Sequence, residues 1–142
     1  MELIALSLMS MENLVELLHE ANITVAVVGA TDNPEKYGSV IYRDLKRKGF
    51  TVFPVNPKRS TVDGDLAFDR IEKISKPPTI VNLVVPPEVT LDVLTQCLNL
   101  GLVNIWLQPG SESPKVMRFL RENGFNYLAN ECIMVQSRLA RR

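Results

Sequence analysis

Three glycines, Gly49, Gly101 and Gly124, divide this chain in the same way. Each ends a segment whose apolar residues have helical spacing, and each is followed at once by an apolar segment of strand type. Glycine is common just past the last turn of a helix, because it adopts the left-handed conformation without strain. A helix–glycine–strand pattern that recurs three times is typical of βαβ units, in which each helix crosses between parallel strands.

The apolar segments predict five strands, at residues 24–28, 51–55, 80–85, 104–107 and 125–129. The helices expected between them cover residues 39–48, 69–74, 87–100 and 114–123. Because parallel crossovers are right-handed, this order predicts an α/β fold. We expect a single doubly wound, Rossmann-like domain with a five-stranded parallel sheet in the order 3-2-1-4-5 and helices on both faces. Ligands of such sheets bind in a crevice at the carboxyl ends of the strands.

The expected Rossmann-like domain covers residues 23–142 and follows an N-terminal helix within residues 1–22. That helix is predicted over residues 11–21, with Ser10 as its N-cap, because its leucines share one face. The tail, residues 133–142, is expected to form a short basic helix. A chain of 142 residues suits one domain with its own core.

The charge balance argues against a nucleic-acid partner, because 16 basic residues face 16 acidic ones. Cys97 and Cys132 lie far apart and His19 is the one histidine, so the sequence predicts neither a metal site nor a disulfide framework. No apolar run approaches the roughly 20 residues of a membrane span. The first nine residues lack the pattern of a signal peptide. These features favour a cytoplasmic protein without membrane association.

Residues 25–38 predict an anion site. An apolar strand stops at Gly29, a polar loop follows, and a helix begins near Ser39. Backbone amides in such a loop and the positive end of the helix dipole favour a phosphate group. Lys36 lies in the same loop and is a candidate phosphate partner.

The loop departs from the dinucleotide pattern G-x-G-x-x-G, because Thr31 and Pro34 stand where two of the glycines belong. The acidic residue that would hold an adenosine ribose is also missing, since strand two is followed by Lys58 and Arg59. A cationic strand end disfavours NAD and favours a nucleotide with an extra phosphate on its ribose. NADP and coenzyme A both meet that condition.

Five ordered segments carry a resemblance to a known family. They read VVGAT at 27–31, FPVNPK at 53–58, VVPP at 84–87, IWLQPG at 105–110 and NECI at 130–133. With these segments the chain resembles the stand-alone CoA-binding proteins, a family similar to the N-terminal domain of the succinyl-CoA synthetase alpha subunit. The likeness covers roughly residues 20–140.

The resemblance implies that coenzyme A lies across the strand ends, with its phosphates against the loop after strand one. It places a basic residue, here Lys58, after strand two, and an apolar wall after strand three. A carboxylate beside a pyrophosphate is repulsive, so Asp32 is a departure unless it points away. The candidate ligand-binding residues are Gly29, Ala30, Thr31, Asp32, Asn33, Pro34, Lys36, Asn56, Pro57, Lys58, Arg59, Val85, Pro86, Pro87, Gln108 and Gly110.

No pair of nucleophile and base is recognisable, so the predicted function is non-catalytic binding of coenzyme A or an acyl-CoA at the carboxyl edge of the sheet. An NADP-binding domain of oxidoreductase type and a nucleotide-sensing regulatory subunit are the alternatives. A homodimer or a protein partner stays possible. Cys132 follows strand five and is the one thiol that could meet a coenzyme thiol, although a buried structural role is the more common one for cysteine. Cys97 is expected in the core and His19 in solvent.

Overall fold

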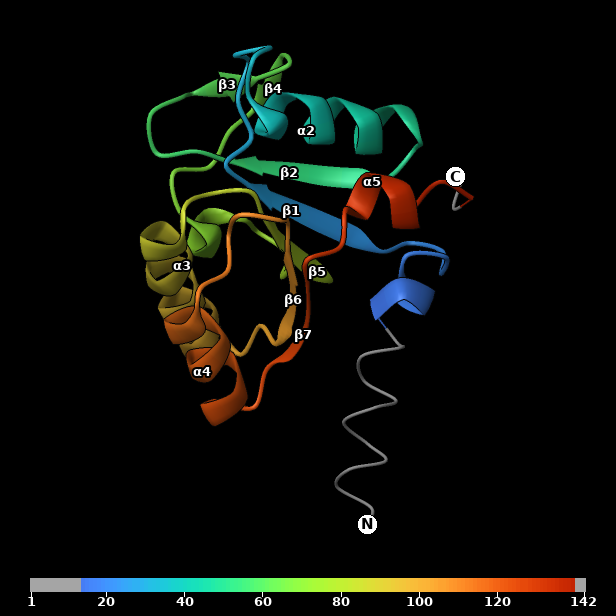
Figure 1. Ribbon diagram of the computed structural model, residues 1–142. Helices are drawn as coiled ribbons and strands as arrows, with labels where there is room; N and C mark the ends of the chain where they lie inside the picture. The colour runs from blue at the N-terminus through green and yellow to red at the C-terminus, as the bar shows by residue number, and fades with distance from the viewer. Residues whose placement is uncertain (1–13, 140–142) are drawn as a thin grey trace.

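The computed structural model describes residues 14–139 and contains one five-stranded parallel sheet (Figure 1). Its strands are β1 (Thr24–Val28), β2 (Thr51–Val55), β5 (Ile80–Leu83), β6 (Asn104–Leu107) and β7 (Asn126–Ala129). They lie in the order β2-β1-β5-β6-β7, and every neighbouring pair is parallel. The predicted α/β class and the five parallel strands are confirmed.

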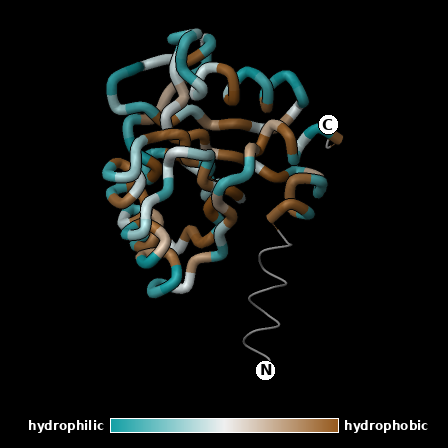
Figure 2. The backbone as a smooth tube through the Cα atoms, viewed as in Figure 1, coloured by the Kyte–Doolittle hydropathy of each residue, from teal (hydrophilic) through white to brown (hydrophobic). Residues whose placement is uncertain are grey.

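Helices cover both faces of this sheet, as predicted (Figure 1). They are α2 (Tyr37–Arg47), α3 (Pro87–Leu100), α4 (Pro114–Glu122), α5 (Ile133–Gln136) and the 3-10 helix η1 (Ile71–Lys73). In β1, Val25 and Val27 pack on the side of α2, whereas Ala26 and Val28 pack on the side of α3. A strand covered on both faces is apolar throughout, which explains the unbroken run in the sequence. Figure 2 shows the central strands in brown and most outer turns in teal.

The strand order corrects the prediction. Counted along the chain, the five strands lie in the order 2-1-3-4-5 rather than 3-2-1-4-5, because β5 pairs with β1. The outer edge of β2 is already occupied near its carboxyl end: the Phe68 N–H donates to the Pro54 carbonyl oxygen at 2.9 Å. The nitrogen of Pro54 faces that same edge and has no hydrogen to donate. Proline is confined to edge strands for this reason, so β5 adds on the other side of β1.

A short hairpin that was not predicted follows β2. It consists of β3 (Thr61–Val62) and β4 (Asp65–Leu66), joined by a turn of two residues with positive φ angles, Asp63 and Gly64. The Tyr42 hydroxyl donates to Asp65 Oδ2 at 2.6 Å. Lys46 Nζ lies 3.1 Å from Asp63 Oδ2 and 2.8 Å from Asp65 Oδ2. These contacts fix the hairpin on α2.

Several predicted helix ends are confirmed. Pro87 is the first residue of α3, where its missing N–H is not needed, and Gly101 follows α3 with a φ of 72°. The Ser113 hydroxyl accepts from the Val116 N–H at 3.1 Å and so caps α4. Helix α2 begins at Tyr37, two residues before the prediction.

The two predicted terminal helices differ from the structure. Residues 14–17 are helical, residues 18–22 form turns, and the start of the predicted helix, with Ser10, lies outside the described residues. The tail helix ends at Gln136, well before residue 142. Across residues 14–139, the helices are all too short or too polar to cross a bilayer.

Candidate functional site

The ends of β1 and β5 form the switch point of this fold, since the connections leave β1 and β5 toward opposite sides of the sheet. Gly29 follows β1 with a φ of 100°, and its N–H donates to the Val55 carbonyl oxygen at 3.0 Å. A Cβ atom at Gly29 would lie 2.6 Å from the Val84 carbonyl oxygen. Only glycine allows the chain to leave the sheet through this space.

Gly38 makes a second close approach, between α2 and the end of β1. A Cβ atom there would overlap the Gly29 carbonyl oxygen and lie 2.9 Å from its carbonyl carbon. The first turn of α2 therefore rests directly on the strand end. Its N-cap, Lys36, makes no side-chain cap hydrogen bond, and the first turn has no acidic residue. The positive end of this helix is open to an anion.

The loop between Gly29 and α2 is held by its own side chains. Thr31 Oγ1 accepts from the Asn33 N–H at 3.2 Å, and Asn33 Oδ1 accepts from the Glu35 N–H at 3.1 Å. Asn56 joins this loop to the end of β2, since its Nδ2 donates to the Ala30 carbonyl oxygen at 2.9 Å. The loops after β1 and β2 thus form one connected rim.

The Asp32 carboxylate contacts both the hairpin and the loop after β2. Its Oδ1 accepts from the Asp63 N–H at 2.7 Å, and its Oδ2 lies 3.5 Å from Arg59 Nη1. Both Asp32 carboxylate oxygens therefore have partners within the chain.

A cavity of about 1180 Å³ opens above the switch point. Twelve of the sixteen predicted residues line it, from the loops after β1, β2, β5 and β6. They are Gly29, Thr31, Asn33, Lys36, Asn56, Pro57, Lys58, Arg59, Val85, Pro86, Pro87 and Gly110. Four predicted residues do not line it: Ala30, Asp32, Pro34 and Gln108. The topology therefore does bring the four predicted loops to one place.

Gln108 has a structural role next to the cavity. It is only 4% exposed, and its Oε1 accepts from the Ile133 N–H at 2.9 Å, which anchors α5. Its Nε2 lies 3.5 Å from the Cys132 sulfur, and Cys132 does not line the cavity either. Cys97 is buried as predicted, and burial raises the pKa of its thiol to about 12. His19 is exposed, also as predicted.

One wall of the cavity was not predicted. It comes from η1, with Ile71, and from α3, with Val89, Asp92, Val93 and Gln96. The four α3 residues have the spacing i, i+3, i+4, i+7, so they share one helix face. Val89 is 41% exposed and lines the cavity. Asp92 and Gln96, which share this helix face with the two valines, are the sequence feature that could have indicated a wall exposed to a cavity.

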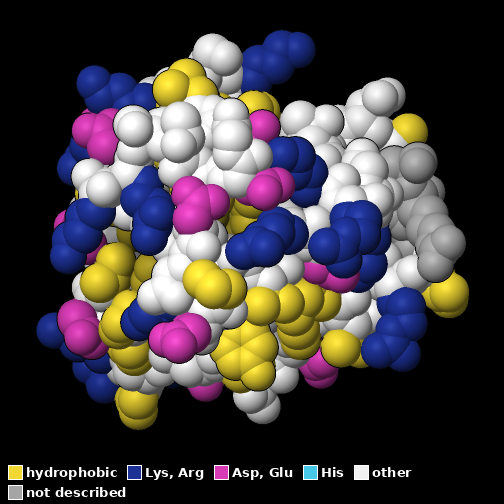
Figure 3. Space-filling model, turned by 90° about the horizontal axis from the view of Figure 1, so that it is seen from above, with side chains coloured by type: hydrophobic (Ala, Val, Ile, Leu, Met, Phe, Trp, Pro, Cys, Tyr) yellow, Lys and Arg dark blue, Asp and Glu magenta, His cyan; other side chains and the backbone are white. Residues whose placement is uncertain are grey.

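The lining carries a local excess of positive charge. The lining includes four basic residues, Lys36, Lys58, Arg59 and Arg70, and two acidic residues, Asp69 and Asp92. Elsewhere charge is mixed: seen from above, basic and acidic side chains are interspersed over α2 and the hairpin (Figure 3). The cavity therefore favours an anion within a chain of balanced charge. Among residues 14–139, no group of three His, Cys, Asp or Glu side chains could hold a metal ion.

Residues 23–138 match the model of the CoA binding domain family. The chain belongs to this family. The resemblance expected from the sequence is thereby confirmed, and the match covers the sheet together with every loop of the cavity.

Several known proteins are similar to this chain. A conserved hypothetical protein from Pyrococcus furiosus has 39% sequence identity and a TM-score of 0.78, over 80% of this chain and 98% of that one. "Uncharacterized protein YneT" of Bacillus subtilis is 27% identical over 78% of this chain and 82% of its own length. The alpha subunit of the ADP-forming acetate–CoA ligase II of P. furiosus is 29% identical over 57% of this chain, which corresponds to 18% of that subunit.

Proposed function

We propose that this CoA binding domain holds coenzyme A, or an acyl-CoA, in the cavity above β1 and β5. One observation carries the proposal: the open end of α2 and the cations Lys58 and Arg59 line the same cavity. Coenzyme A is a nucleotide with a pyrophosphate and a separate ribose phosphate, so it needs two anion subsites. Membership of the family supports this ligand.

The two subsites differ in their chemistry. The loop after β1, the first turn of α2 and Lys36 offer backbone amides and one ammonium group, which suit the pyrophosphate. Lys58 and Arg59, at the end of β2, suit the ribose phosphate. The ion pair between Arg59 and Asp32 is long at 3.5 Å, and both side chains are more than a third exposed. Such a pair contributes little, so the Arg59 guanidinium can turn to a phosphate at small cost.

The side of the cavity that follows β5 is apolar. Val85, Pro86 and Pro87 line the cavity after β5, and the two prolines present no N–H groups. We propose that this segment contacts the pantetheine arm. The role assigned to the site is binding, with no reaction.

The test compares coenzyme A with dephospho-CoA, which lacks the ribose phosphate, by titration calorimetry. We expect the wild-type protein to prefer coenzyme A. Lys58→Ala should weaken the binding of coenzyme A about three- to tenfold, since an exposed charge contact is worth roughly 1 kcal/mol. The affinity for dephospho-CoA should stay nearly unchanged. Lys115→Ala, at an exposed α4 position away from the cavity, is the matched control.

Equal binding of the two compounds by the wild-type protein would remove the role of Lys58. NADP is titrated beside them, because the same cationic strand end fits its ribose phosphate. Tighter binding of NADP than of coenzyme A would replace the proposed ligand.

A further inference from the structure

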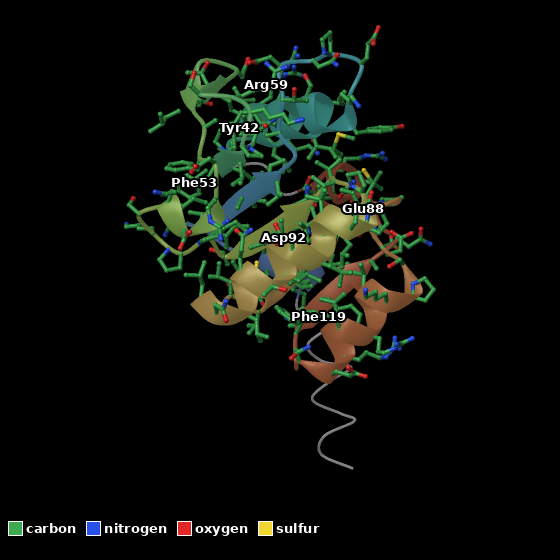
Figure 4. The ribbon with its side chains drawn as sticks, turned by 90° about the vertical axis from the view of Figure 1, so that its left-hand side faces the viewer. Tyr42, Phe53, Arg59, Glu88, Asp92 and Phe119 are labelled. Carbon is green, nitrogen blue, oxygen red and sulfur yellow. The ribbon has the colours of Figure 1, made fainter. Side chains whose placement is uncertain are left out.

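The α3 wall of the cavity combines apolar residues with two polar side chains. The apolar residues are Ile71, Val89 and Val93, and Asp92 and Gln96 stand one helical turn apart beside them. At 1.5 Å per residue, Gln96 lies about 13 Å along the helix axis from Pro87. The wall is thus long enough to hold a nucleoside beyond the phosphates. In Figure 4, Asp92 lies on α3 and Arg59 lies on the opposite side of the opening.

Asp92 is unexpected in a cavity that favours anions. Its carboxylate can only accept hydrogen bonds, and it repels phosphate oxygens. Within the part of the chain that the structure describes, neither the Asp92 nor the Gln96 side chain has a hydrogen bond or ion pair. Their polar atoms are therefore available to a ligand group that donates hydrogen bonds.

We infer that Asp92 and Gln96 recognise the adenine ring and make the site specific for it; this rests on the proposed function. Adenine presents an exocyclic amine, which donates, next to a ring nitrogen, which accepts. A glutamine amide matches that pair of groups, and the carboxylate accepts from the amine. Hypoxanthine carries an oxygen in place of the amine, and that oxygen would face the Asp92 carboxylate. The valines and Ile71 contact the face of the ring.

The test measures the affinity of coenzyme A and of its deaminated analogue, in which hypoxanthine replaces adenine. The wild-type protein should prefer coenzyme A by about ten- to a hundredfold, as expected for a hydrogen bond to a charged group. Asp92→Ala should reduce this preference to about threefold or less, and Gln96→Ala should reduce it in part. Glu88→Gln, an exposed position of α3 that does not line the cavity, should keep the full preference.

Three results separate the inference from the function on which it rests. Equal affinity of the wild-type protein for both compounds, with coenzyme A bound, would overturn the role of Asp92 and Gln96 alone. A full preference in Asp92→Ala would do the same. Absence of coenzyme A binding would refute the proposed function and the inference with it. Because Asp92 is exposed, its replacement should leave the unfolding midpoint unchanged, which a urea titration of each variant checks.

Discussion

Replacing Gly38 by alanine tests how tightly α2 is seated on the end of β1. Alanine normally stabilises a helix relative to glycine by roughly 1 kcal/mol. Here the added Cβ would overlap the carbonyl oxygen of Gly29, which is backbone and cannot rotate away. Overpacking of this kind costs about 1–3 kcal/mol, and a backbone clash belongs at the upper end of that range. The net expectation is a loss of about 2 kcal/mol in the free energy of unfolding.

The assay is urea unfolding followed by the fluorescence of Trp106, the one tryptophan, whose side chain is fully buried. With a typical urea dependence for a domain of this size, a loss of about 2 kcal/mol lowers the midpoint by roughly 1 M. Asn99→Ala is the matched control, because it adds alanine at an exposed position of α3 and should be neutral or slightly stabilising. A Gly38→Ala protein as stable as the wild type would refute the close approach of α2 to β1.

Three further predictions concern the surroundings of the cavity. Asn56→Ala should lower the free energy of unfolding by about 1–2 kcal/mol in urea and weaken the binding of coenzyme A in calorimetry, because Asn56 joins the loops after β1 and β2. An unchanged free energy of unfolding together with an unchanged affinity would contradict that role. Burial and then the Asp65 carboxylate raise the pKa of Tyr42, so its contribution to stability should be complete below about pH 10, the pKa of an unfolded tyrosine, and be lost above it. Unfolding of Tyr42→Phe should therefore depend less on pH above 10, and an identical pH dependence would contradict the assignment. A thiol reagent at pH 8 should label Cys132 before Cys97, whose pKa burial raises to about 12, and Cys132→Ser should lose the fast phase.

The sequence was sufficient for the strands and for most of the cavity. Strands β1, β2 and β6 have the predicted bounds, because each is a short, mainly apolar segment that ends at a turn containing glycine or proline. The loops that end these strands also meet as predicted, since parallel strands must place their carboxyl ends at one edge. What the pattern of a single segment decides was therefore predictable.

The strand order was not predicted, although one residue indicated it. Pro54 lies inside β2, and a proline there argues for an edge strand, which the order 3-2-1-4-5 does not allow. The hairpin was missed for a similar reason. Asp63-Gly64 is the common sequence of a two-residue hairpin turn, and short polar strands around it have too little apolar pattern to be noticed.

The α3 wall could not be predicted from helical spacing alone. The valines at 89 and 93 have the spacing of a face that packs on a sheet, yet with Asp92 and Gln96 they line the cavity, close to where α3 contacts η1. Whether such a face meets protein or ligand depends on the length of the segment between β2 and β5. That is a property of the tertiary structure and not of the helix.

The most direct test of the central claim is a crystal structure of the protein with coenzyme A. The account predicts the pyrophosphate against the loop after Gly29 and the first turn of α2, with the ribose phosphate within hydrogen-bond distance of Lys58 or Arg59. Coenzyme A bound at another surface, or a ribose phosphate that points away from the end of β2, would contradict it.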